Sequence, residues 1–195
     1  MSSAKKLHRM ISVEDYLAGE LIAPVKHEYV GGEVYAMSGA RNLHNRIAGN
    51  IYFSTRNSLS GKPCLPLNSD TKIRIRSVTP DRFYYPDTSI VCQPNPDRDS
   101  FQDNPVVLFE VLSKNTRRID TGEKKDAYLS IPSLRAYVVV EQEMAAVVVY
   151  RRTESDFVRE LYEGLDAVLP LGEVGISLPL AEIYEAVEFI PEEDD

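Results

Sequence analysis

Residues 106–112 read Val-Val-Leu-Phe-Glu-Val-Leu, a run that is apolar apart from the single acid Glu110. A short apolar run of this kind is typical of a β-strand that is covered on both faces. Strand alternation places Leu108, Glu110 and Leu112 on one face of the predicted strand. Because an ionised carboxylate is seldom buried without a partner, the surroundings of Glu110 must supply a cation, hydrogen-bond donors or access to solvent.

A second acid stands at the start of another apolar strand. Asp87 follows Tyr85-Pro86 and precedes a strand predicted over residues 88–92. If the two strands are neighbours, Asp87 and Glu110 repel each other, and one of them holds a proton unless a cation is present. A divalent cation removes this conflict, and Mg²⁺ prefers oxygen ligands while it keeps several waters. The two acids therefore predict a metal site of the kind that cleaves phosphate esters.

The remaining pattern of short strands and helices predicts an α/β (or α+β) fold around a mixed β-sheet. A glycine pair at residues 31–32 predicts an N-terminal β-hairpin within residues 26–37, in which Glu28 and Glu33 share a face. Helices are expected over residues 12–20, 42–60, 120–129 and 180–187, with Ser12 and Asp120 as the N-caps of the first and third. Further strands are expected over residues 64–67, 71–76, 135–141, 145–151 and 157–162.

Composition and charge limit the partners and the location of the protein. A chain of 195 residues fits one domain, expected over residues 1–187, with an acidic tail over residues 188–195. The net charge of −8 argues against a protein that coats nucleic acid without specificity, because such binding depends on neutralising phosphates. No apolar run is long enough for a membrane span or a secretory signal, so a cytoplasmic protein is expected. Cys64 and Cys92 have no metal-ligand spacing and are expected to be reduced thiols.

The order of Pro86-Asp87 followed by a strand glutamate at Glu110 resembles the PD-(D/E)XK nuclease superfamily. In that superfamily a catalytic lysine normally stands two positions after the second acid, where this chain has Leu112, and the nearest lysine is Lys114. The wider pattern resembles the Uma2 family, a branch of the same superfamily. The motifs that carry this resemblance are His27-Glu-Tyr-Val-Gly-Gly-Glu33, His44, Tyr85-Pro-Asp87, Glu110-Val-Leu-Ser-Lys-Asn-Thr-Arg-Arg-Ile-Asp120, Gly122-Glu-Lys124, Tyr128, Leu134-Arg-Ala-Tyr137 and Leu178-Pro-Leu-Ala-Glu-Ile-Tyr184.

The resemblance covers residues 10–187 and implies a restriction-endonuclease-like fold with metal-dependent DNA endonuclease activity. It implies that Asp87 and Glu110 bind Mg²⁺ or Mn²⁺. It also implies that the catalytic lysine has moved to the following helix, at Lys124, where a long side chain can reach back and stabilise charge on the phosphoryl oxygens. Glu28 is a candidate third carboxylate. A homodimer is expected, since two sites make the cutting of two strands easiest.

Three residues near the proposed site are candidates for contacts with nucleic acid. His44 opens the second helix, and Arg117 and Arg118 lie between the Glu110 strand and the next helix. Arginine is a common phosphate ligand, although arginines in a solvated loop are equally ordinary.

Three alternatives remain open from the sequence. Lys124 and Asp120 are four residues apart and could form an ordinary surface ion pair. Leu112 at the position of the superfamily lysine would suit a nuclease-like fold that only binds nucleic acid or protein. The low basicity of the chain would suit a hydrolase of a smaller phosphate ester.

Overall fold

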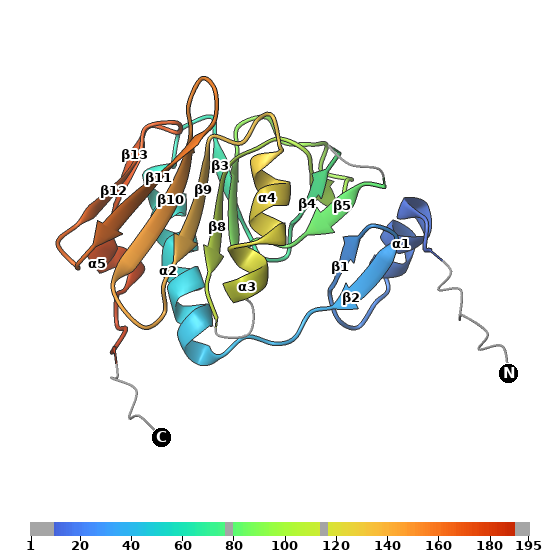
Figure 1. Ribbon diagram of the computed structural model, residues 1–195, viewed down its shortest axis with the longest axis horizontal. Coiled ribbons are helices and arrows are strands. Elements are labelled where there is room, and N and C mark those ends of the chain that lie inside the picture. The colour runs from blue at the N-terminus through green and yellow to red at the C-terminus, as the bar shows by residue number, and fades with distance from the viewer. Residues whose placement is uncertain (1–9, 77–79, 114–116, 190–195) are drawn as a thin grey trace, which may run out of the picture.

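Two mixed β-sheets form the centre of the fold, with helices packed against them (Figure 1). The structure, a computed structural model, describes residues 10–76, 80–113 and 117–189. The first sheet has the order β2-β1-β5-β4-β7, with β1 (His27–Val30), β2 (Glu33–Ala36), β4 (Lys72–Ile75), β5 (Arg82–Tyr84) and β7 (Phe101–Gln102). The second has the order β11-β10-β9-β8-β6-β3, with β3 (Leu65–Asn68), β6 (Thr88–Val91), β8 (Pro105–Val111), β9 (Ala136–Val140), β10 (Ala146–Arg152) and β11 (Phe157–Glu163).

The other elements complete a mixed α/β fold, as the sequence predicts. A separate antiparallel pair is formed by β12 (Val168–Leu171) and β13 (Ile176–Pro179). The helices are α1 (Val13–Glu20), α2 (Asn42–Ser58), α3 (Arg117–Asp120), α4 (Glu123–Leu129) and α5 (Leu180–Ile183). Within the described ranges, no helix is long and apolar enough to cross a membrane.

Strand β8 lies inside the second sheet and sets the position of the two acids. It pairs antiparallel with β6 and parallel with β9, and all of its residues except Val106 are buried. In the β6–β8 ladder Thr88 lies opposite Phe109. Asp87 precedes Thr88 by one residue, so the antiparallel register brings it opposite Glu110.

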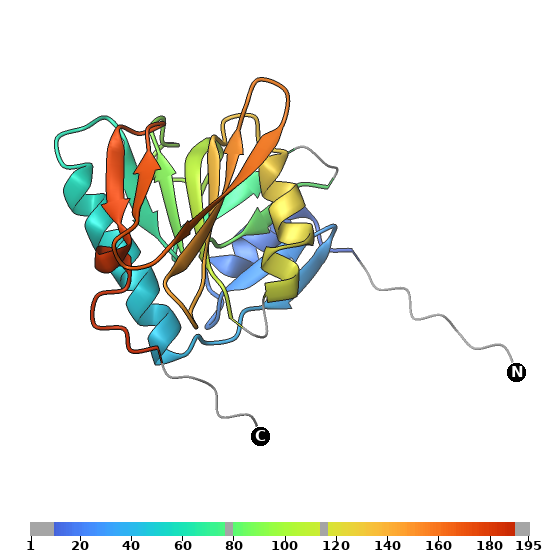
Figure 2. The ribbon, with the colours of Figure 1, turned by 60° about the vertical axis from the view of Figure 1, so that its left-hand side comes forward.

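The two faces of β8 contact different hydrophobic clusters, as its alternation predicts. Val107, Phe109 and Val111 pack with residues of α2, α5, β12 and β13. Leu108 packs on the other face, with residues of α4 and the first sheet. Figure 2 shows α2 and α4 on opposite sides of the second sheet. Glu110 shares the face of Leu108, so its side chain points toward α4.

The N-terminal hairpin has the register that the glycine pair predicts. Val30 lies opposite Glu33, and Glu28 lies opposite Tyr35. The two turn glycines have φ values of +61° and +93°, a conformation that side-chain-bearing residues rarely adopt. This confirmed register fixes the side of the hairpin on which Glu28 lies.

Two local expectations are wrong. Cys64 and Cys92 form a disulfide instead of remaining reduced thiols. They directly flank the β3–β6 ladder, in which Leu65 pairs with Val91, so the two side chains meet at the end of that ladder. Asp120 is not the N-cap of the helix that carries Lys124, because that helix is divided into α3 and α4 and Gly122 precedes the second part.

Four short strands are not predicted by the sequence pattern. Strands β5, β7, β12 and β13 have two to four residues each, too few to show a clear alternation. The last helix, α5, ends at Ile183, earlier than expected. Residues 190–195 of the expected acidic tail lie outside the described residues.

Candidate active site

The ammonium group of Lys124 lies inside a buried cluster of carboxylates. Lys124 is in the first turn of α4 and only 5% of its surface is exposed. Its Nζ is 2.9 Å from Glu110 Oε1, 3.0 Å from Glu28 Oε1 and 3.9 Å from Asp120 Oδ1. The structure thus brings together acids from β1 and β8 with a lysine from α4. The alternative of an ordinary surface pair between Lys124 and Asp120 is wrong, since both side chains are buried.

A tight connection between α3 and α4 precedes Lys124. A Cβ atom at position 122 would lie 2.6 Å from the Arg118 carbonyl oxygen, so the backbone can follow this path only with glycine there. Asp120, Lys124 and Tyr128 then follow at intervals of four residues, and all three are buried. The Tyr128 hydroxyl donates a hydrogen bond to Glu110 Oε1 at 3.2 Å.

Asp120 and Tyr128 are members of the cluster to which the sequence pattern assigns no role in the site. The signal that identifies them is their spacing of four residues on either side of Lys124, which places them on the same side of the helical segment. Asp120 adds a further negative charge near Lys124, and Tyr128 orients the Glu110 carboxylate.

The environment of Glu110 opposes its charged form. Burial raises the pKa of Glu110 well above its usual value, the Lys124 ammonium lowers it, and the Asp120 and Asp87 carboxylates raise it again. Burial lowers the pKa of Lys124, but the charges of Glu110, Glu28 and Asp120 outweigh that effect and leave it raised. Lys124 therefore keeps its proton at neutral pH, in a cluster that holds more carboxylates than cations.

Asp87 is tied to the strand of Glu110 and to helix α2. Its Oδ2 accepts a hydrogen bond from the backbone N–H of Val111 at 2.8 Å, and its Oδ1 is 2.9 Å from His44 Nε2. Burial lowers the pKa of His44, but the hydrogen bond and the charge of Asp87 outweigh burial, so the pKa is raised. His44 therefore contacts one of the two acids instead of pointing away from them.

The carboxylate oxygens of the site suit a hard cation that takes few ligands from the protein. Glu28, Asp87, Glu110 and Asp120 place four carboxylates near one ammonium and one imidazole, and a divalent cation would offset the excess negative charge. Each carboxylate oxygen has two lone pairs, so the hydrogen bonds to Asp87 and Glu110 leave acceptor capacity. Among residues 10–76, 80–113 and 117–189, no three side chains of His, Cys, Asp or Glu converge closely enough to hold a metal ion. A pair of carboxylates fits Mg²⁺, which commonly takes one or two from the protein and keeps waters in the other positions.

The two candidate arginines lie at the α3 end of the site and differ in their partners and in their exposure to solvent. The Arg117 guanidinium donates two hydrogen bonds to the Glu141 carboxylate, at 2.8 and 2.6 Å, whereas Arg118 is exposed. Leu112 packs in the apolar cluster beneath α4, so the position of the superfamily lysine belongs to the core. Lys114 lies outside the described residues.

Comparisons with known proteins identify a family and related chains. The sequence matches the family described as "Uma2: Putative restriction endonuclease" over residues 13–181. It is 34% identical over 182 residues to the protein slr1290 of Synechocystis sp.. These aligned residues make up 92% of this chain and 94% of that protein. The protein sll1609 of the same organism is 26% identical over 137 residues, or 69% of this chain and 76% of that protein.

The fold also resembles a solved structure. The crystal structure described as a putative nuclease belonging to DUF820 from Anabaena variabilis superimposes with a TM-score of 0.70 and covers 88% of this chain and 98% of that one. The two sequences are 14% identical, so this likeness concerns the fold.

Proposed function

The chain belongs to the Uma2 family, described as putative restriction endonucleases, and on this basis we propose that it is a metal-dependent endonuclease that hydrolyses phosphodiester bonds in DNA. The observation that carries the proposal is the distance of 2.9 Å between Lys124 Nζ and Glu110 Oε1. A lysine from α4 supplies the cation that is missing at position 112, beside two acids that the β6–β8 register places opposite each other.

In this proposal the two opposed acids hold the metal and the lysine acts on the phosphate. Asp87 and Glu110 would hold Mg²⁺ or Mn²⁺, and the ion would activate a water and polarise the phosphate. Lys124 keeps its proton and stabilises the charge that develops on the phosphoryl oxygens. Glu28 holds the Lys124 ammonium together with Glu110, and Tyr128 fixes the orientation of the Glu110 carboxylate.

Contacts with DNA and the assembly of two sites belong to the same proposal. The exposed Arg118 is available to a backbone phosphate, while Arg117 reaches a phosphate only by exchanging its pair with Glu141. His44 is hydrogen-bonded to Asp87. In this proposal it would therefore contact the DNA next to the metal ligands. A homodimer would provide one site for each strand of a duplex.

Supercoiled plasmid provides the direct test. The purified protein is expected to convert it to the nicked form with Mg²⁺ or Mn²⁺ and to stop when EDTA is added. An Asp87→Asn variant keeps the size of the side chain but loses the negative charge, so it is expected to be inactive. Nicking that persists with EDTA or in this variant would contradict the proposal. Cleavage of short nucleotides without nicking would instead support a hydrolase of smaller phosphate esters.

Tyr128→Phe is expected to lower the nicking rate by about tenfold, because the Glu110 carboxylate loses a hydrogen-bond donor that orients it. Single-turnover nicking with saturating Mg²⁺ measures the effect. Tyr150→Phe is the matched control, because Tyr150 packs at the edge of the same cluster and stacks on Tyr137, and no hydrogen bond within the described residues joins it to Glu110. Equal rates for the two variants would show that the Tyr128 hydroxyl has no part in the site.

A further inference from the structure

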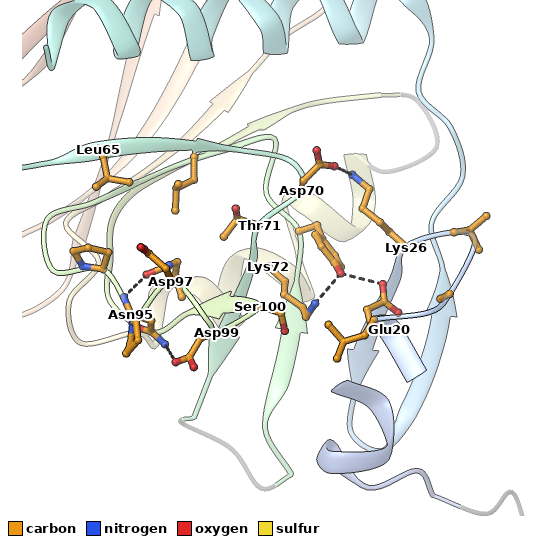
Figure 3. A pocket seen from close by; sticks show the side chains of 18 of the residues that line it. Glu20, Lys26, Leu65, Asp70, Thr71, Lys72, Asn95, Asp97, Asp99 and Ser100 are labelled. Atoms are coloured by element: carbon orange, nitrogen blue, oxygen red, sulfur yellow. Dashed lines mark hydrogen bonds and ion pairs between the residues drawn. The ribbon is translucent and has the colours of Figure 1, made fainter. Parts of the chain in front are cut away.

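Several charged groups around the cavity of about 610 Å³ beside β4 already have partners within the chain. Figure 3 shows Lys72 linked through the Tyr85 hydroxyl to Glu20. Asp70 is paired with Lys26 at 3.2 Å. The free edge of the second sheet differs in this respect. Its last strand, β11, pairs on one side only, with β10.

Strand β11 is longer and less protected than the other edge strands of the two sheets. It has seven residues, whereas β2 and β3 have four each and β7 has two. β3 also contains Pro66, which has no N–H to donate. Natural sheets commonly block their edges with short strands, proline, lysine or bulges. β11 contains no proline, glycine or lysine, so its edge is able to pair with another strand.

Hydrogen bonds at the two ends of the β10–β11 hairpin identify the backbone groups that point outward. The Thr153 N–H donates to the Asp156 carbonyl at 2.7 Å, and the Gly164 N–H donates to the Ala145 carbonyl at 2.9 Å. Bonded and non-bonded pairs alternate in an antiparallel ladder, so the even-numbered residues of β11 bond β10. The N–H and C=O groups of the odd-numbered residues therefore point to the outer edge.

The side chains of these odd-numbered residues share the face of the sheet that carries α4. Leu161 lies opposite Val148, which packs against the apolar cluster beneath α4. Leu161 is 47% exposed. Arg159 and Glu163 are exposed, and neither forms an ion pair or a side-chain hydrogen bond within the described residues. The edge thus carries an apolar side chain with opposite charges two residues to either side.

We infer that β11 pairs antiparallel with β11 of a second copy of the chain, around a two-fold axis at Leu161. Such an axis is normal to the sheet, so each side chain keeps its own face. Leu161 then contacts its own copy, and each Arg159 lies directly opposite Glu163 of the partner subunit. Opposite charges across a ladder are stabilising, and the outward N–H and C=O groups of all three residues gain partners.

Other registers of the same two strands lack this match. An axis at Arg159 would place two arginines opposite each other, and an axis at Glu160 would do the same with two glutamates. An axis at Tyr162 would place Leu161 opposite Glu163. Like charges directly opposite each other are destabilising, so the charge pattern selects the axis at Leu161.

This inference gives the homodimer of the proposed function a specific interface. Its tests measure association without DNA or metal. A monomer that nicks plasmid would overturn the interface alone, and a dimer that does not nick would contradict the nuclease alone.

Sedimentation equilibrium of the full chain is expected to show a dimer. Arg159→Glu and Glu163→Arg each create two like-charge pairs across the axis, so each is expected to raise the dissociation constant by at least about tenfold. Combining the two substitutions restores opposite charges and is expected to return the constant to within about threefold of the original value. Arg56→Glu makes the same charge change at an exposed position of α2 and is the matched control, expected to leave the constant unchanged.

Hydrogen exchange of single amides, followed by NMR, tests the register. The amides of residues 159, 161 and 163 are expected to be protected in the dimer and to exchange rapidly in Arg159→Glu. The amides of residues 158, 160 and 162 bond β10 and are expected to stay protected in both, which shows that the variant is folded. A monomeric chain, a dimer that neither single variant weakens, a double variant as weak as the single ones, or unprotected odd-numbered amides in the dimer would overturn the inference.

Discussion

Lys124→Met is expected to lower the rate of plasmid nicking by about a hundred- to a thousandfold, the usual effect of removing one charge-stabilising donor from a transition state. The loss follows from position, because Lys124 is the lysine whose Nζ lies within 3.0 Å of both Glu28 and Glu110. Methionine keeps most of the volume and removes the charge. Single-turnover nicking at saturating Mg²⁺ measures the change.

The same substitution is expected to destabilise the fold by about 3 kcal/mol, since it leaves buried carboxylates without their cation. This value is at the low end for broken buried pairs because Glu110 can take up a proton. Urea unfolding measures the loss, and calorimetric binding of Mn²⁺ separates lost catalysis from lost structure, since Asp87 and Glu110 remain in place.

Lys125→Met is the matched control for both measurements. Lys125 is the next residue of α4, and its Nζ pairs at 3.5 Å with Asp126, which is largely exposed. Its replacement is expected to change stability by less than about 0.5 kcal/mol and to leave nicking unchanged. If Lys124→Met nicks plasmid as fast as Lys125→Met does, Lys124 has no catalytic role.

The parts of this fold that the sequence predicts are those set by local periodicity. The alternation of residues 106–112 gives the correct face for Glu110, and the glycine pair after Val30 gives the correct hairpin register. Both patterns depend on residues within a few positions of each other, so a single segment contains the whole signal.

Other features depend on contacts between distant segments and leave little trace in the local sequence. The disulfide requires that β3 and β6 pair in one register, which brings together Cys64 and Cys92 from positions 28 residues apart. The inward position of Asp120 depends on tertiary packing, in which the Tyr137 hydroxyl donates a hydrogen bond to the Asp120 carbonyl oxygen at 2.9 Å. An Asp at the start of a predicted helix gives the same sequence pattern whether its side chain caps the helix or points toward the core.

The position of Lys124 can be predicted only in part from the local sequence. Its spacing from Asp120 is equally compatible with a surface pair, and only the packing of α4 over the Glu110 face of β8 decides between the two. A family resemblance can suggest the buried position because related chains share the packing, whereas helix periodicity alone cannot.

Glu110→Gln is expected to separate catalysis from stability. The amide keeps the shape of the side chain but removes a metal ligand, so nicking is expected to fall by about a thousandfold or more. Stability is expected to be unchanged or higher, because burial and the charges of Asp87 and Asp120 disfavour the Glu110 carboxylate, while Lys124 keeps Glu28 as a partner. Glu33→Gln, an exposed acid of the hairpin, is the control and should alter neither property.

Combining Glu110→Gln with Lys124→Met tests whether the two residues form one energetic unit. With Glu110 already neutral, loss of the ammonium leaves fewer uncompensated carboxylates, so the destabilisation by Lys124→Met is expected to shrink by about 1 kcal/mol or more. The free energies of unfolding of the two single variants and the double variant provide this difference. Additive effects would mean that the 2.9 Å contact between Lys124 Nζ and Glu110 Oε1 contributes no net coupling, and that Glu28 and Asp120 alone hold the lysine in place.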